Sequence, residues 1–393
     1  MRVAIVTDHF DADRGGAGNW TCQFVRHLLH RDHEVHVFAQ VLSPTALQWP
    51  IVPHRLPLGV GRLRLASEAE AQLRRLDLDI IHDMGVGWYC DIFHSHDGSR
   101  LAQREQNWLA TPRFLRPLKR PLYRVLPRYR EWDALSARQF EASERLFLAL
   151  SWMVAHDYQH LHKVPANRIR LVYNGVDTRR FSPENQVVHR ENIRRQMGIR
   201  KDETLALFVG HDFRRKGLAT ATRAVARLAQ AGAPIRLAVV GGKRPQGGRE
   251  SAKPPRADGP VTFVGFVYDP VPYYAAADVF VLPSFYDPCS LSVLEAAACG
   301  LPSITTYVNG AGELLHHGED GLLLSNPADD QELASQLRTL LDPALRSHMG
   351  NAALAMAHRH TMEHNCDQVL DLYCEVLERH KYKTVRSQAR AAA

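Results

Sequence analysis

The same order of strand, glycine-containing turn and helix opens both halves of the chain. In the first half, an apolar run at residues 3–6 leads into the glycine-rich turn 14–18 and then a segment with the apolar spacing of a helix. In the second half, the run 204–210 leads into the basic turn 214–217 and an alanine-rich segment at 219–231. Strands that alternate with helices pair in parallel, so this repeated pattern predicts two α/β domains with mostly parallel sheets.

Further short apolar runs supply the other strands. They lie at residues 34–38, 79–82, 91–94, 146–150 and 170–172, and then at 235–240, 261–264, 279–282, 303–306 and 321–324. With 393 residues the chain is long enough for two sizeable domains. We expect a first domain over 1–174, a second over 175–355, and a C-terminal helix over 356–393 that packs toward the first domain and ends in a frayed tail. Sheets of this kind bind ligands at the carboxyl ends of their strands, which predicts an active site in a cleft between the domains.

Cysteine usage and hydropathy exclude several classes of protein. The six cysteines are scattered without a C-x-x-C pair, so neither a disulfide scaffold nor a structural zinc site is expected. No window approaches the roughly 18 apolar residues of a membrane-spanning helix, and the first apolar run is too short for a signal peptide. We expect a cytoplasmic protein whose contact with a membrane is peripheral.

The densest group of candidate functional residues lies at 283–302, with the sequence PSFYDPCSLSVLEAAACGLP. Asp287 lies in a loop between a predicted strand and a predicted helix. The backbone amides of Ser290 and Leu291 lie where that helix begins, and such amides bind anions. Glu295 lies inside the helix, where its carboxylate could accept hydrogen bonds from both hydroxyls of a ribose.

This segment resembles the glutamate-x7-glutamate signature of the retaining glycosyltransferases of family 4. These enzymes have the α/β GT-B fold, in which two Rossmann-like, doubly wound parallel-sheet domains face an interdomain cleft. Residues 123–141 and 211–217 are similar to the lipopolysaccharide core glucosyltransferase I group. Further family marks cover most of the chain and lie at residues 174–177 with Phe181, 210–217, 276–279, 310–313 and 320–321.

The resemblance implies that several residues bind a nucleotide diphosphate sugar. Arg215 and Lys216 match the basic pair that neutralises the diphosphate, and Glu295 matches the glutamate that holds the ribose. Gly15 and Gly16 resemble the glycine loop that lets the backbone approach the sugar diphosphate. From the residues alone, the basic cluster could equally be a solvated turn, the glycines an ordinary turn and the glutamate a surface acid of the helix.

Asp287 departs from the family, which usually has a glutamate at this position in contact with the hydroxyls of the donor sugar. Cys289 and Ser290 also replace the common phenylalanine–glycine pair. These changes leave the identity of the donor sugar open. Cys289 has no basic partner nearby in the sequence, so we do not expect it to act as a nucleophile.

His94 to Asp97 follow a predicted strand of the first half and should face the cleft. His96 matches the family histidine near the donor sugar's hydroxyls, and Asp97 matches an aspartate of the core glucosyltransferases. We take His96, Asp97 and Asp287 as the catalytic candidates. The two histidines could instead form a metal site or a structural pair. The family generally needs no bound metal, so we expect no cofactor besides the donor, with a UDP-sugar favoured.

Residues 100–130 carry nine basic residues and one acid, a net charge of +8 where the whole chain has +7. Tryptophan, phenylalanine, tyrosine and leucine lie between the charges, and four prolines prevent one long helix. This composition predicts a surface that binds the anionic headgroups of a membrane. A solvated basic face and a nucleic-acid groove are the alternatives. Because the segment has no known nucleic-acid-binding motif, we expect no nucleic acid as a partner.

Together these features predict an enzyme that transfers a hexose, with glucose favoured, from a nucleotide diphosphate sugar to a membrane-associated glycolipid such as lipopolysaccharide core. The protein would lie at the inner face of the cytoplasmic membrane. The resemblance implies retention at the anomeric carbon, with the leaving phosphate oxygen taking the acceptor's proton. The alternatives are a nucleotide-sugar epimerase of the same fold and a non-catalytic protein that binds an anionic surface.

Overall fold

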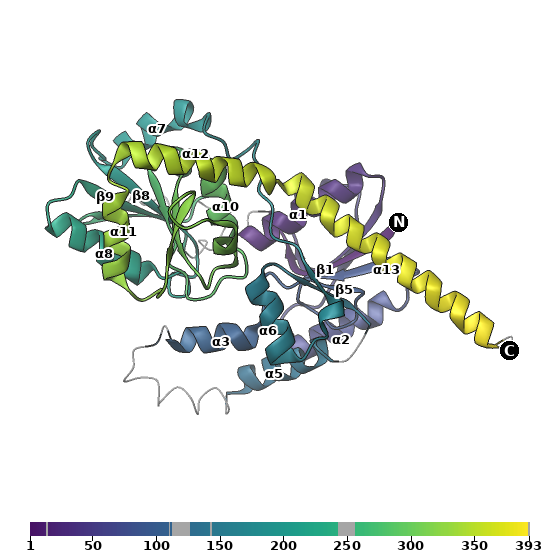
Figure 1. Cartoon of the computed structure of the whole chain (residues 1–393). Coiled ribbons are helices and arrows are strands. Elements are labelled where there is room, and N and C mark those ends of the chain that lie inside the picture. The colour runs from purple at the N-terminus through teal and green to yellow at the C-terminus, as the bar shows by residue number, and fades with distance from the viewer. Residues whose placement is uncertain (13–14, 110, 112–125, 142–143, 243–255, 392–393) are drawn as a thin grey trace. The chain divides into compact units, whose positions relative to one another are not determined.

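The computed structural model describes residues 1–12, 15–109, 111, 126–141, 144–242 and 256–391 (Figure 1). The chain forms two compact units, each made of separate stretches. The first unit consists of Met1–Ala102, Pro112–Val172 and Glu363–Ala393, and the second of Gln103–Thr111 and Tyr173–Met362. The C-terminal helix is therefore part of the first unit.

The first unit is built on a seven-stranded sheet in the order β3-β2-β1-β4-β5-β6-β7, with every neighbouring pair parallel. Its strands are β1 (Arg2–Phe10), β2 (Glu34–Leu42), β3 (Val52–Arg55), β4 (Ile80–Asp83), β5 (Ile92–Phe93), β6 (Leu146–Ala149) and β7 (Ile169–Leu171). Its helices are α1 (Gly16–His30), α2 (Arg62–Leu73), α5 (Pro127–Gln139), α6 (Trp152–His162) and α13 (Met362–Ala391), while α3 (Arg100–Leu109) runs from the first unit into the second.

The centre of this sheet forms because β1 is apolar on both faces. Val3, Ala4, Ile5 and Val6 are fully buried, as parallel strands covered by helices on both sides must be. Helix α1 supplies part of this cover through Trp20, Phe24 and Leu28, which recur at helical spacing and are buried.

The second unit repeats this design around another seven-stranded sheet, in the order β10-β11-β9-β8-β12-β13-β14. All its neighbouring pairs are parallel except β10 with β11. Its strands are β8 (Thr204–Val209), β9 (Ile235–Val240), β10 (Arg256–Asp258), β11 (Val261–Gly265), β12 (Val279–Val281), β13 (Ser303–Thr306) and β14 (Gly321–Leu324). Its helices are α7 (Asn185–Gln196), α8 (Leu218–Gln230), α9 (Val271–Ala276), α10 (Leu291–Ala298), α11 (Asp330–Thr339) and α12 (Pro343–Arg359).

The predicted α/β class with two doubly wound parallel-sheet domains is confirmed, and each predicted strand begins within one residue of its expected start, although β1 and β2 extend four residues further than predicted. Strand β3 was not predicted, because it is an edge strand that contains Pro53, is mostly exposed and lacks the apolar pattern of the others. Helix α13 continues to Ala391, and fraying of its last turns stays a prediction. The central part of the basic segment, 112–125, lies outside the described residues.

Candidate active site

The predicted site residues lie near the points where the strand order of each sheet changes direction. In the first unit this point is between β1 and β4, and Gly15 and Gly16 follow β1. In the second unit it is between β8 and β12; Arg215 and Lys216 follow β8, and Asp287 follows β12. Open α/β sheets bind ligands at the carboxyl ends of strands at such points.

In the second unit, an ion pair and a hydrogen bond connect the turn after β8 to the loop after β12. Lys216 Nζ forms an ion pair with Asp287 Oδ2, and both side chains are almost buried, with 11% and 7% exposed. Arg215 donates from a guanidinium nitrogen to the Tyr286 carbonyl oxygen at 3.3 Å and from Nε to Asp212 at 3.3 Å. The structure thus brings together three of the predicted site residues, Arg215, Lys216 and Asp287, from segments 71 residues apart.

Gly217 makes this close approach possible. Its φ of +76° lies in the left-handed region, and a Cβ at this position would lie 2.0 Å from the Pro283 carbonyl oxygen. Only glycine can occupy a position that is both left-handed and in contact with another backbone. The conformation of Gly217 therefore sets the position of the neighbouring Lys216.

The loop between β12 and α10 is held by buried amide side chains. Asn309 Oδ1 accepts the Ser290 N–H at 3.2 Å and the Ala311 N–H at 3.1 Å, and Asn174 donates to the Cys289 carbonyl oxygen at 2.7 Å. The Ser290 amide is therefore already engaged by Asn309, and an anion would have to compete for it. Leu291 is the first residue of α10 and is partly buried. Asn309, which the sequence analysis missed, follows a strand, and that position could have identified it.

Glu295 lies in α10 and accepts a hydrogen bond from the Tyr274 hydroxyl at 2.7 Å. Burial raises the pKa of Glu295, while the hydrogen bond from Tyr274 and the positive charges of Arg180 and Lys216 oppose the rise. Tyr274 is fully buried and was also missed by the sequence analysis, although it precedes the family mark at 276–279. The carboxylate is thus oriented by a tyrosine rather than free on the helix surface.

Asp278 belongs to the same family mark but has a structural role. It forms ion pairs with Arg190 at 2.5 Å and Arg194 at 3.0 Å, and it accepts the Leu205 N–H at 2.7 Å. These contacts join α7 to the start of β8.

In the first unit, Gly15 and Gly16 begin α1. Gly15 has a φ of 100° and precedes the helix, Gly16 is its first residue, and both are exposed. An exposed helix terminus without side chains leaves the backbone amides accessible, as the predicted diphosphate contact requires.

His96 and Asp97 follow β5, and their side chains have different surroundings. Asp97 is exposed and forms an ion pair with Arg100 at 3.7 Å. His96 is partly exposed, and its ring lies against Trp20 and His94, with centroids 4.9 and 4.5 Å away. Burial lowers the pKa of His96 to about 4, so the ring is neutral at pH 7. A neutral imidazole could serve as a hydrogen-bonding group for a sugar hydroxyl.

Three further results concern the predicted chemistry. Burial raises the pKa of the Cys289 thiol, so it stays protonated at neutral pH. Within the described ranges, no three histidine, cysteine, aspartate or glutamate side chains are arranged to hold a metal ion. In the same part of the chain, no helix is both long and apolar enough to cross a bilayer.

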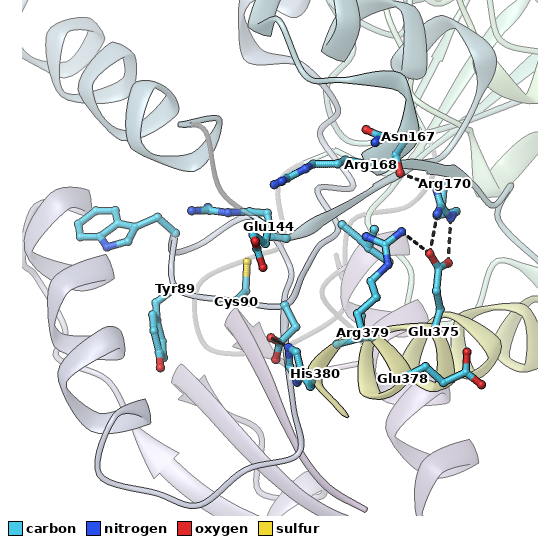
Figure 2. A pocket seen from close by; sticks show the side chains of 15 residues that line it. Tyr89, Cys90, Glu144, Asn167, Arg168, Arg170, Glu375, Glu378, Arg379 and His380 are labelled. Atoms are coloured by element: carbon cyan, nitrogen blue, oxygen red, sulfur yellow. Dashed lines mark hydrogen bonds and ion pairs between the residues drawn. The ribbon is translucent and has the colours of Figure 1, made fainter. Parts of the chain in front are cut away.

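A cavity of about 1020 Å³ opens elsewhere in the first unit (Figure 2). It lies at the amino ends of β5, β6 and β7, the opposite edge of the sheet from Gly15 and His96. Several of its charges neutralise one another: Glu375 pairs with Arg170 at 2.5 Å and with Arg379 at 2.5 Å (Figure 2). The cavity is separate from the predicted site residues.

Comparison with known proteins gives two family models. Residues 14–180 match a model described as Glycosyltransferase Family 4, and residues 203–343 match a model described as Glycosyl transferases group 1. The first match covers most of the first unit and the second most of the second unit. Together the matches include every predicted site residue.

Among curated proteins, a D-inositol 3-phosphate glycosyltransferase of Acidothermus cellulolyticus is 28% identical, covering 99% of this chain and 94% of the relative. The lipopolysaccharide glucosyltransferase WaaG of Escherichia coli is 29% identical over 64% of this chain and 66% of its own. The solved structure of a WaaG has a TM-score of 0.76 at 21% identity, covering 94% of this chain and 99% of that one. Alr3699/HepE of Anabaena in complex with UDP-glucose has a TM-score of 0.66 at 19% identity, covering 95% and 100%.

The fold, the positions of the site residues and these matches agree with one another. The likeness to the solved structures establishes the GT-B fold, and the two family models together span most of the chain. The chain therefore consists of a Glycosyltransferase Family 4 domain over residues 14–180 and a Glycosyl transferases group 1 domain over residues 203–343, arranged as two α/β units of the GT-B fold.

Proposed function

We propose that the protein is a retaining hexosyltransferase that moves a hexose, with glucose favoured, from a UDP-sugar to a membrane-associated glycolipid such as lipopolysaccharide core. The observation that carries this proposal is the buried Lys216–Asp287 pair with Arg215 beside it, at the carboxyl ends of β8 and β12. Two cations next to a carboxylate fit a ligand that joins a diphosphate to a sugar, because the cations offset phosphate charge and the carboxylate accepts hydrogen bonds from hydroxyls.

In this mechanism the protein stabilises the departing diphosphate and orients the reacting sugar. Arg215 and Lys216 offset the charge that grows on the leaving phosphate, and the first turn of α10 and the glycines at the start of α1 supply backbone amides. Asp287 and His96 hold sugar hydroxyls. The acceptor attacks the face from which the diphosphate departs, and a phosphate oxygen takes its proton. Reaction on that face retains the anomeric configuration.

The similarity to WaaG and to the HepE complex with UDP-glucose supports glucose and UDP as donor groups. The similarity to the D-inositol 3-phosphate glycosyltransferase of Acidothermus extends over 99% of the chain and supports a second candidate acceptor, an inositol phosphate. Both acceptors carry several hydroxyls and at least one phosphate, so a transfer assay must decide between them.

The test begins with thermal unfolding in the presence of UDP-, GDP- and ADP-sugars. A ligand at 100 times its dissociation constant stabilises by about 2.7 kcal/mol. The stabilising donor is then incubated with lipopolysaccharide inner core or with D-inositol 3-phosphate, and the anomeric configuration of the product is read by NMR. Donor converted without an acceptor would indicate an epimerase. Absence of stabilisation by every donor would refute the enzyme proposal.

We also propose that residues 100–130 hold the protein at the inner face of the cytoplasmic membrane. Arg128 and Arg130 are exposed at the start of α5. Arg100, in contrast, stacks on Trp132 at 3.3 Å and pairs with Asp97, so it contributes less to the outer charge than the sequence analysis assumes.

Sedimentation with phosphatidylglycerol vesicles tests this proposal. Each basic residue near an anionic surface contributes about 1 kcal/mol, so reversing the charges of Arg128 and Arg130 together should weaken binding by at least about tenfold. Phosphatidylcholine vesicles are the control. Equal binding to both lipids would contradict an electrostatic membrane surface.

A further inference from the structure

The ring of His96 is oriented by packing alone. Its Nε2 is buried without a hydrogen-bond partner in the part of the chain that the structure describes. The rings that surround it are Trp20, from α1, and His94, from the same loop. The orientation of His96 therefore depends on whatever fixes these two rings.

Trp20 is fixed by the C-terminal helix. Its indole N–H donates to Asn365 Oδ1 at 2.7 Å in a buried hydrogen bond between residues 345 positions apart. The indole also lies edge-on against His94, with centroids 4.7 Å apart, and stacks on Phe24. Asn365 thus holds the ring that contacts both histidines.

His94 is fixed by the same helix through a second route. The Tyr373 hydroxyl lies 2.7 Å from His82 Nδ1, and His82 Nε2 lies 3.1 Å from His94 Nδ1. Tyr373 and His82 are fully buried, and His94 is almost fully buried. The three side chains form a hydrogen-bonded row from α13 to the loop that carries His96.

The hydrogen bonds of this row couple the protons of the two rings. Burial lowers the pKa of His82 to about 3 and the pKa of His94 well below its usual value, so both rings are neutral at pH 7. If the Tyr373 hydroxyl donates, both rings carry their proton on Nε2, and His94 Nε2 is a buried donor without an acceptor in the described part of the chain. In the reverse direction both rings carry their proton on Nδ1, and the Tyr373 hydroxyl is the donor without an acceptor. In either direction each ring has one defined tautomer.

We propose that α13 positions His96 for the sugar substrate, through Asn365 and Trp20 on one side and through Tyr373, His82 and His94 on the other. Asn365 and Tyr373 are then positioning residues, remote in sequence from the group they serve. This inference rests on the proposed function, because it takes His96 as the residue that contacts the donor sugar. The row of hydrogen bonds fixes one tautomer of His94, and the fixed tautomer in turn keeps the ring beside His96 in one orientation.

The test compares Tyr373→Phe with a matched control, Tyr158→Phe. Tyr158 is also a fully buried tyrosine of the first unit, but its hydroxyl has no hydrogen-bond partner within the described ranges. Loss of one buried hydrogen bond corresponds to about a fivefold effect. We expect kcat/KM for UDP-glucose to fall about fivefold in Tyr373→Phe, with an unchanged KM for the acceptor, and to stay at the wild-type value in Tyr158→Phe.

Histidine side-chain ¹⁵N NMR supplies a readout that does not depend on activity. In wild-type protein His82 and His94 should each show a single tautomer, with the proton on the same nitrogen, Nδ1 or Nε2, in both rings. Tyr373→Phe should give mixed tautomers and shift the His96 resonances, whereas Tyr158→Phe should do neither. Unchanged tautomers and unchanged His96 resonances in Tyr373→Phe would overturn the proposal.

Asn365→Ala tests the route through Trp20, and it replaces Tyr373→Phe as the test if that variant does not fold. It should shift the His96 resonances and lower kcat/KM for the donor by a similar factor, and unchanged values of both would overturn that route. His96→Ala separates this inference from the proposed function. If His96→Ala retains full activity while Tyr373→Phe still shifts the ring, the sugar contact is wrong but the positioning by α13 stands as a structural fact.

Discussion

The Lys216–Asp287 pair gives the sharpest quantitative prediction. Both side chains are about nine-tenths buried, so removal of one partner leaves the other as an uncompensated buried charge. Breaking a buried pair in this way costs about 3–5 kcal/mol. We expect Lys216→Met and Asp287→Asn each to lower the free energy of unfolding of the second unit by about that amount.

The double variant Lys216→Met/Asp287→Asn separates charge pairing from packing. It contains no unpaired charge, so it should lose less stability than the sum of the single variants, by about 2–3 kcal/mol. Urea unfolding of all three variants measures the coupling, provided that the slope of the transition is unchanged. Lys201→Met is the control, because Lys201 is exposed and its replacement should change stability by less than about 0.5 kcal/mol. Strictly additive losses would refute the reasoning.

The same variants test the donor site. Without Lys216 the diphosphate loses a buried cation, so UDP should stabilise neither Lys216→Met nor the double variant against thermal unfolding. Asp287→Asn keeps the cation and should still be stabilised by UDP, while transfer from UDP-glucose falls. Full stabilisation of Lys216→Met by UDP would contradict the assignment of Lys216 to the diphosphate.

Three further predictions concern other parts of the site. Gly217→Ala should abolish donor binding and destabilise the second unit in urea unfolding, because the new Cβ would meet the Pro283 carbonyl oxygen at 2.0 Å in a left-handed backbone. Tyr274→Phe removes the hydrogen bond that opposes the raised pKa of Glu295, so calorimetry should show UDP affinity falling at a higher pH on acidification than in wild type. Burial lowers the pKa of His96 from 6.5 to about 4, so on acidification the unfolded state takes up a proton at a higher pH than the folded state. The stability that the neutral ring contributes above about pH 6.5 is therefore lost toward pH 4, by about 3 kcal/mol. His96→Gln should lack this part of the pH dependence in urea unfolding, and an identical slope would show that His96 does not cause it.

Local order in the sequence predicted which candidate residues lie in the turns that follow strands. Arg215, Lys216 and Asp287 were identified because each follows a strand and lies in a family motif. The predicted role of the Ser290 amide could not take account of Asn309, which binds that amide from 19 residues further along the chain. Tyr274 was missed because a tyrosine in an apolar helix has the pattern of a core residue, and only its hydrogen bond to Glu295 gives it a further role.

By itself the sequence determined the two doubly wound sheets and the turns that carry the candidate residues, because strand and helix periodicity and glycine turns act over a few residues. Only the tertiary structure decided which side chains meet. Lys216 pairs with Asp287 across 71 residues, and Asn365 bonds to Trp20 across 345. Such pairs depend on how packed elements align their side chains, and no local pattern specifies that alignment. The surroundings of His96, and with them the role proposed for α13, became visible only once the strands and helices had been brought together.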